Sequence, residues 1–415
     1  MPKDLLTITK VEKRGKKITI FFEAEGRWND FIDEFSIENT YSEDIGSVPD
    51  SIAVIPALCN LLPMAWVYDL AIKVKDIDKV FYESIPNILN GYKDMYKDMK
   101  FGGEIIAEKI VKNKNLGMQQ AGVLYSGGVD ATTTVYRHLQ ESPDIITVLG
   151  SDIKLSDLEG IAKVNKNNRA FAREHNLKYE SIYSTFRSFL KESGKALSDT
   201  EELKSRGHGW WHEFQHGIGL IGLVAPLSYI RGYKTVYIAS SYHVSQKGKY
   251  TCASDPTIDN ELRYSNTNTY HDGYELTRQD KIRFICNFAK EHDLKPYLRV
   301  CWESSGGENC CHCEKCRRTC LAIIAEKHDP ADYGLKLSDL AYKRMIKWYK
   351  RHLVYKYDRA GYLRYKPIQD AFNSNWSEQE TPKELKWFRD VAICSKKLPF
   401  YTKYVDLARR KLNIE

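Results

Sequence analysis

Residues 126–132 bring two glycines, two hydroxyl side chains and a carboxylate into one short turn. The segment Ser126-Gly127-Gly128-Val129-Asp130-Ala131-Thr132 follows the apolar run 121–125 and precedes a stretch with helical character. Glycines let the backbone approach an anion closely, and a helix N-terminus offers free N–H groups and partial positive charge. Ser126 and Thr132 could donate hydroxyls to the same anion, whereas the carboxylate of Asp130 suits Mg²⁺ or orientation of the loop. We therefore predict a phosphate-binding loop, although neither G-K-[ST] nor GxGxxG is present.

Four cysteines in the second half of the chain have the spacing of metal ligands. Cys301, Cys310, Cys313 and Cys316 follow the pattern C-x8-C-x2-C-x2-C. Four thiolates complete a tetrahedral site with no open position, so we predict a structural Zn²⁺ ion that helps to fold this segment. Catalysis by a reactive cysteine is the alternative, but no pattern of His and Asp partners accompanies these residues.

Polar and aromatic residues near the ends of the expected strands are candidates for binding nucleotide or substrate. Asp152 could bond a nucleotide, or it could cap the helix that follows. The remaining candidates are Trp211, His212, His216, His271 and Arg278. The histidines could act as general bases, the indole could stack on a purine and the guanidinium could pair with a phosphate or carboxylate. For each, a structural role in the core or on a solvated surface is the alternative.

The elements that must position these residues follow from hydrophobic periodicity. Expected strands span 121–125, 145–149, 179–183 and 235–239, and expected helices span 129–139, 158–175, 212–230 and 278–292. This alternation predicts an α/β fold with a doubly wound, mostly parallel sheet. Ligands bind such sheets beyond the carboxyl ends of the strands, where the glycine-rich turn and Asp152 would lie. Residues 240–273 are expected to form a long polar loop at the same edge.

The flanking segments are expected to be separate domains. The N-terminal segment opens with a hairpin signal at 5–9 and 18–22, and helical patterns follow over 52–74 and 80–99. We predict three domains: an N-terminal α+β accessory domain over 1–117, a nucleotide-binding domain with the cysteine site over 118–330, and a helical extension over 331–415.

Positive charge is concentrated in the last 75 residues, which carry 18 Lys and Arg against 8 Asp and Glu, while the whole chain has a net charge of +7. Tyr and Trp are interleaved with these cations. A basic surface with aromatic side chains is typical of nucleic-acid binding. The alternative is a helical domain with solvated cations and an aromatic core.

Composition also bears on the compartment. The first 17 residues are charged throughout, and the most apolar stretch, 52–74, contains two prolines, Asn60 and Asp69. A signal peptide or membrane helix would avoid these residues. We expect a cytoplasmic protein without membrane contact, whose 10 cysteines are thiols or metal ligands rather than disulfides.

The glycine-rich turn and the cysteine spacing together resemble the 7-cyano-7-deazaguanine synthase (QueC) family. The turn is similar to the SGGxDS pyrophosphate loop (PP-loop) of the ATP pyrophosphatases, except that Ala131 replaces the second serine. The resemblance covers about half of the chain, from Ala121 to Ala325. It implies that Ser126, Gly127, Gly128, Asp130 and Thr132 form an ATP loop and that the four cysteines bind zinc.

The resemblance also implies a reaction. The family uses ATP, with Mg²⁺, to adenylate 7-carboxy-7-deazaguanine, and ammonia then attacks the adenylate as AMP leaves. Residues 209–217 and 240–278 depart from the family, and the two flanking segments are additional. This architecture is more similar to divergent relatives in bacterial antiphage defence, which implies a protein amine as another possible acceptor. A tRNA-modifying PP-loop enzyme and a nucleotide-binding protein with a vestigial loop are the alternatives.

Overall fold

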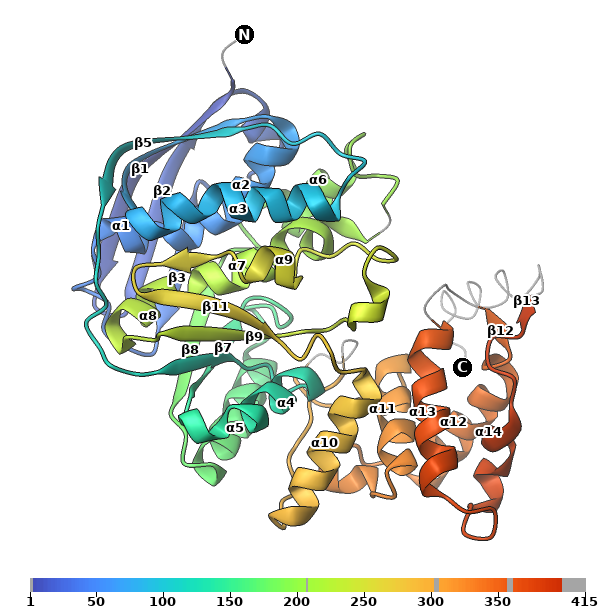
Figure 1. The fold of residues 1–415 in the computed structure, drawn as a ribbon. Coiled ribbons are helices and arrows are strands. Elements are labelled where there is room, and N and C mark those ends of the chain that lie inside the picture. Colours follow the sequence, from blue (N-terminus) through green and yellow to red (C-terminus); the bar gives the residue numbers. More distant parts are fainter. Residues whose placement is uncertain (1–2, 207, 302–305, 357–360, 398–415) are drawn as a thin grey trace. The chain divides into compact units, whose positions relative to one another are not determined.

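The computed structural model describes residues 3–206, 208–301, 306–356 and 361–397 (Figure 1). The chain divides into two compact units. The first consists of Met1–Leu276 and Ser305–Gly307, and the second of Thr277–Ser304 and Glu308–Glu415. The glycine-rich turn belongs to the first unit, and all four clustered cysteines belong to the second.

A single mixed sheet of 11 strands organises the first unit, so the protein has an α/β fold. The strand order is β10-β11-β9-β6-β7-β8-β3-β2-β1-β4-β5. In chain order, the strands are β1 (Leu5–Arg14), β2 (Lys17–Ala24), β3 (Ser36–Tyr41), β4 (Ala71–Asp78), β5 (Glu104–Val111), β6 (Ala121–Leu124), β7 (Asp144–Leu149), β8 (Tyr179–Ser184), β9 (Thr235–Ala239), β10 (Arg263–Tyr264) and β11 (Thr267–Asp272).

Parallel pairing predominates in this sheet. Strands β11, β9, β6, β7 and β8 run parallel, and so do β1, β4 and β5. The antiparallel pairs are β10 with β11, β1 with β2, β2 with β3, and β3 with β8. The last of these pairs, in which Asn39 lies opposite Ser184, joins the strands of the N-terminal segment to the central parallel strands. One sheet therefore runs across the boundary expected near residue 117.

Helices cover both sides of the central strands. Figure 1 shows α4 and α5 on one side of β7–β9, with α7 and α9 on the other. The helical segments of this unit are η1 (Gly26–Asp30), α1 (Asp50–Ala53), α2 (Ile55–Tyr68), α3 (Lys79–Met95), α4 (Val129–Arg137), η2 (Leu139–Glu141), α5 (Leu158–Glu174), η3 (Lys191–Gly194), α6 (Lys195–Ser198), η4 (Trp211–Gln215), α7 (His216–Leu223), α8 (Ala225–Arg231), η5 (Val244–Gln246) and α9 (Pro256–Asp259).

The core of the first unit is built around α2, whose residues are all buried. Glycines of α7 permit the close packing of these two helices: a Cβ on Gly222 would lie 2.4 Å from the Cβ of Cys59, and one on Gly219 would lie 2.7 Å from Oδ1 of Asn60. This apolar region is therefore an internal helix of the core. Among the residues that the structure describes, no helix is both long and apolar enough to cross a bilayer.

Two expectations from the sequence are wrong. The helical pattern over 52–74 ends at Tyr68, because Asp69 adopts a left-handed conformation with φ 55° and the chain then enters β4. The polar loop expected over 240–273 contains α9, β10 and β11. Strand β11 is buried although it lacks an apolar pattern, because hydrogen bonds satisfy its polar side chains. Thr269 donates to the carbonyl of Leu262, and His271 bonds Asp259.

The second unit is mainly helical. Its elements are α10 (Arg278–Glu291), α11 (Glu314–Ala325), η6 (Pro330–Tyr333), α12 (Asp339–His352), β12 (Tyr355–Lys356), α13 (Gly361–Asn375), η7 (Lys383–Leu385), α14 (Lys386–Asp390) and β13 (Lys396–Lys397). Several of its aromatic side chains are buried, among them Tyr349, Phe372 and Phe388. These rings form part of the core of the unit.

Candidate functional site

The glycine-rich turn lies between a central strand and the start of a helix. Strand β6 is fully buried, and α4 begins at Val129 after Gly128. Gly127 has φ 77°, a left-handed conformation that disfavours residues with a Cβ. The N-cap residue of α4 is Gly128, which has no side chain to cap the helix, whereas Asp157 caps α5 and Asp78 caps α3. A helix N-terminus that follows a buried strand through a glycine turn is a common site of anion binding.

The polar side chains of the turn lie at different depths. Ser126 is exposed and accepts a hydrogen bond from the Gly128 N–H at 3.3 Å. Asp130 is half-buried in the first turn of α4. Thr132 is fully buried, and its hydroxyl lies 3.5 Å from the hydroxyl of Tyr125. The predicted donation from Thr132 to a phosphate therefore remains a prediction, while Ser126 is the hydroxyl on the accessible side of the turn.

The end of β7 lies beside the glycine-rich turn, because β6 and β7 are neighbours in the sheet. Gly150 has φ 99°, and a Cβ there would lie 2.0 Å from the carbonyl oxygen of Ser184. Asp152 is exposed two residues further on. The guanidinium of Arg187, which the sequence analysis did not select, donates to the carbonyl of Ser151 at 2.8 Å. This edge thus combines a carboxylate and a guanidinium.

Arg187 connects this edge to the predicted substrate residues. Its guanidinium lies 4.5 Å from the ring centroid of Trp211, close enough for a cation–π interaction. The ring of Trp211 also lies 4.9 Å from the ring of His216, in an edge-to-face arrangement. Burial lowers the pKa of Arg187. The neighbouring Trp210 is buried and stacks on Phe214, so it belongs to the core.

His212 belongs to the same helical segment, but its imidazole is already bonded. Nε2 lies 3.0 Å from the carbonyl oxygen of Thr251 and 3.3 Å from the hydroxyl of Tyr242. Burial, together with His208 and His216, lowers the pKa of His212 to about 4. Since a carbonyl oxygen can only accept, the neutral ring is expected to carry its proton on Nε2.

His271 is placed in a different environment. Its side chain is buried, and Nδ1 lies 2.7 Å from Oδ2 of Asp259, which also accepts a hydrogen bond from Ser254 at 2.8 Å. Burial raises the pKa of Asp259. Nε2 of His271 has no hydrogen-bond partner among the described residues. The structure thus pairs this histidine with an aspartate that the sequence analysis did not select.

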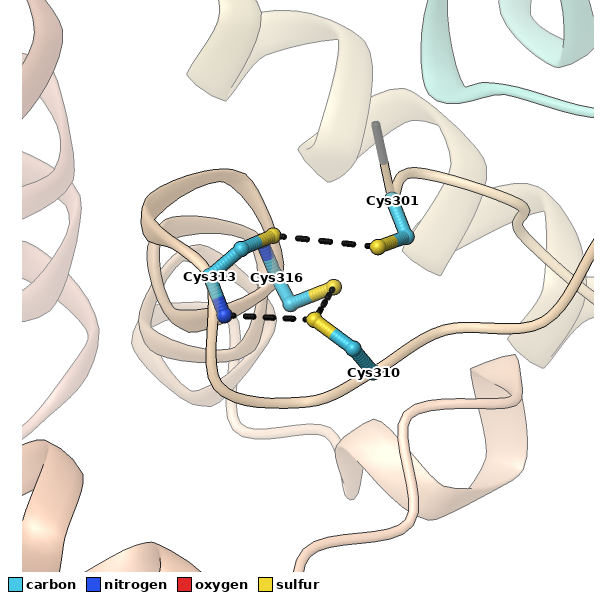
Figure 2. Close-up of side chains that lie close together, drawn as sticks. All are labelled: Cys301, Cys310, Cys313 and Cys316. Atoms are coloured by element: carbon cyan, nitrogen blue, oxygen red, sulfur yellow. Dashed lines mark hydrogen bonds between the residues drawn. The ribbon is translucent and has the colours of Figure 1, made fainter. Parts of the chain in front are cut away.

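In the second unit, the four predicted metal ligands converge (Figure 2). The Sγ atoms of Cys301, Cys310, Cys313 and Cys316 all lie within 4.8 Å of one another. Cys301 and Cys313 are 3.9 Å apart at sulfur, and so are Cys310 and Cys316. Tetrahedral coordination with Zn–S bonds of about 2.3 Å places sulfurs about 3.8 Å apart. The four residues therefore fit a zinc ion, and the cluster could hold one.

Backbone hydrogen bonds to the sulfurs favour negative charge in the cluster, which suits a cation. The N–H of Cys313 points to Sγ of Cys310 at 3.3 Å, and the N–H of Cys316 points to Sγ of Cys313 at 3.4 Å. A hydrogen bond from Cys316 is the main cause that lowers the pKa of Cys313 to about 5, and the same contact raises the pKa of Cys316. Cys313 also caps α11, so the helix N-terminus further favours negative charge at this sulfur.

Asn309 fixes the two chain segments that supply the sulfurs. Its Oδ1 accepts hydrogen bonds from the N–H groups of Val300 and Cys301, and its Nδ2 donates to the carbonyls of Leu298 and Gly334. Cys311 adopts φ 59°, which turns the chain between Cys310 and Cys313. Because an asparagine gives no pattern of its own, this positioning role could not be recognised from the sequence.

The remaining candidate, Arg278, falls outside these clusters. Arg278 belongs to the second unit, where it is the first residue of α10. His312 is an exposed side chain whose Nδ1 lies 2.9 Å from the carbonyl oxygen of Cys310.

Comparison with protein-family models, with curated proteins and with solved structures found no match. A function for this protein is therefore inferred from these geometries and from the sequence motifs.

Proposed function

We propose that the protein is an ATP-dependent carbon–nitrogen ligase of the PP-loop type, with a doubly wound nucleotide-binding core and a structural zinc site. The observation that carries the proposal is the N-terminus of α4, whose N-cap residue is a glycine and which follows a buried parallel strand through Gly127 and Gly128. Backbone N–H groups at such a position stabilise phosphate oxygens. The sequence Ser126–Asp130, similar to the PP-loop, makes ATP the expected ligand.

Adenylation needs positioning and charge stabilisation more than a nucleophilic side chain. A carboxylate oxygen of the substrate attacks the α-phosphorus of ATP, and the bond to the pyrophosphate oxygen breaks. The N–H groups of the turn and the hydroxyl of Ser126 stabilise the negative charge that develops on the pyrophosphate. Asp130 would hold the Mg²⁺ that accompanies ATP, and that ion would neutralise phosphate charge.

An amine then attacks the acyl carbon, and the C–O bond to AMP breaks. The amine must lose a proton, so a general base is needed. His212 is poorly suited, since its Nε2 faces the Thr251 carbonyl. At His271, Asp259 at Nδ1 leaves the Nε2 lone pair for a proton, but Nε2 is buried and would have to be uncovered to reach an amine. His216, beside Trp211, is the second candidate.

The proposed substrate is 7-carboxy-7-deazaguanine or a similar deazapurine carboxylate, with ammonia or a protein amine as acceptor. This choice rests on the sequence resemblance, as does the proposed role in antiphage defence. The pairing of Arg187 with Trp211 supports it, since a guanidinium and an indole suit an acidic heterocycle. A tRNA-modifying activity and a vestigial loop that binds ATP without cleaving it are the alternatives.

The decisive experiment is the release of AMP from α-labelled ATP in the presence of 7-carboxy-7-deazaguanine, with and without ammonia. AMP formation that depends on the carboxylate supports the proposal. Asp130→Ala should abolish AMP formation without unfolding the protein, whereas the exposed Asp199→Ala serves as a control and should leave it unchanged. ATP binding without AMP under all conditions would favour the vestigial loop, and unchanged turnover in Asp130→Ala would exclude the PP-loop assignment.

A further inference from the structure

Helix α12 presents a row of cations on one face. Lys343, Lys347, Lys350 and Arg351 are all exposed. Their spacing of three, four, seven and eight residues places them within one sector of the helix. Together with Ile346, they line an open depression of about 560 Å³. The row is about 12 Å long, given a rise of about 1.5 Å per residue.

No described residue neutralises this row. None of its four cations forms an ion pair or hydrogen bond with the residues at 3–206, 208–301, 306–356 or 361–397. Some cations on other helices pair with acids one turn away. In the second unit, Lys366 pairs with Asp370 on α13 and Arg318 with Glu314 on α11. Helix α12 departs from this arrangement.

The departure is unfavourable for the isolated helix. Lys343, Lys347 and Arg351 follow one another at i, i+4 and i+8, and like charges at this spacing destabilise a helix. Repulsion of this kind is relieved when an anion binds along the row. Acidic residues placed between the cations would remove this repulsion on a surface that faces only solvent, as Asp370 does for Lys366 on α13. The unpaired row therefore points to a negatively charged partner.

We infer that this face of α12 binds the phosphate backbone of a nucleic acid. A row about 12 Å long exceeds the size of one phosphate group, so the partner must carry repeated charges. Successive cations about one helical turn apart can contact successive phosphates of a strand lying in the depression. Ile346, at the centre of the row, is only 6% exposed and offers no side chain for insertion into a bilayer.

The test is the binding of the full-length protein to a labelled single-stranded RNA of about 20 nucleotides, measured by fluorescence anisotropy at several salt concentrations. The triple variant Lys343→Gln/Lys347→Gln/Lys350→Gln should weaken binding about 100-fold at 0.1 M salt and lower the salt slope by about 2. Gln matches Lys in helix propensity, so circular dichroism should be unchanged. The corresponding Lys→Arg variant should retain binding.

A matched control removes the same charge elsewhere. Lys75→Gln/Lys166→Gln/Lys234→Gln alters three exposed lysines of the first unit and should leave RNA affinity within about twofold of wild type. Equal losses in both triple variants, or no loss in the α12 variant, would overturn the inference. Binding to anionic phosphatidylserine vesicles but not to RNA would also overturn it. AMP formation does not enter this test, so its outcome is independent of the proposed function.

Discussion

The glycine-rich turn of the first unit and the cysteine cluster of the second differ in where their ligand-binding atoms come from. At the cysteine cluster, four side chains would supply all the ligand atoms of the proposed zinc site, and their sulfurs lie at distances suited to one ion. At the turn, the binding groups are backbone N–H groups, which every helix N-terminus carries. The cluster can therefore be assigned to a class of metal from its own geometry. The turn acquires a ligand only together with its strand, its glycines and the sequence around it.

The two sites also differ in what each contributes to the fold. Binding of the proposed zinc ion by four thiolates would contribute directly to folding, because such a site does not exist in an unfolded chain. The turn is held by β6 and α4, which are formed by core packing whether or not a phosphate is present. Substitutions should therefore affect mainly structure at the cluster and mainly ligand binding at the turn.

The largest effect is expected for Cys313→Ser. A structural zinc site contributes about 10–16 kcal/mol at neutral pH, so loss of one thiolate should abolish the single bound zinc and unfold the second unit. Metal analysis and limited proteolysis would measure this. Cys311→Ser changes a neighbouring cysteine outside the cluster and should retain zinc. A fully folded Cys313→Ser protein would show that the cluster does not support the fold.

A smaller effect is expected for Asn309→Ala, which removes the hydrogen bonds that hold Cys301 and its neighbours. Loss of such supporting contacts lowers metal affinity about 10- to 100-fold. Competition with a zinc chelator would measure the change. Asn113→Ala, which removes side-chain contacts to Ser51 and Asp78 in the first unit, should leave zinc affinity unchanged. Equal zinc affinity in Asn309→Ala would assign these contacts to fold stability alone.

At the turn, Gly127→Ala tests the backbone directly. An alanine at φ 77° costs about 1–2 kcal/mol of conformational strain, and relief of that strain should displace the N–H groups and weaken ATP binding about tenfold. Calorimetric titration with ATP would measure the loss. Gly15→Ala has a similar φ of 56° in the β1–β2 hairpin with no atom within 4 Å, so it should be equally strained without affecting ATP. Equal ATP affinities in the two variants would argue against ATP binding at the glycine-rich turn.

The smallest effect is expected for Thr132→Val. Its hydroxyl lies in the core beside Tyr125, so removal should change the free energy of unfolding by less than about 1 kcal/mol and ATP affinity by less than about twofold. Ser126→Ala, which removes the exposed hydroxyl of the turn, should weaken ATP binding more. The opposite order would support Thr132 as the phosphate donor and would reverse the contrast between the two hydroxyls.

Local patterns in the sequence predicted much of the central sheet. The apolar runs at β6, β7, β8 and β9 and the amphipathic helices α5 and α10 lie where periodicity placed them, within a residue or two. Strand β11 was not predicted from hydrophobic periodicity, because Thr267, Thr269 and His271 are polar although each is buried. Their hydrogen-bond partners, such as Tyr233 and Asp259, lie elsewhere in the chain, so no local pattern reveals their burial.

By itself, the sequence determined the cysteine spacing and the strand–turn–helix order around Gly127, because both are set by residues a few positions apart. The tertiary structure alone decided which distant residues support these sites. It joined the N-terminal strands to the central sheet through β3 and β8, placed Arg187 against Trp211, and set Asn309 across the segments that carry the cysteines. These contacts depend on the path of the whole chain, because each joins groups whose positions are fixed only when the core has packed.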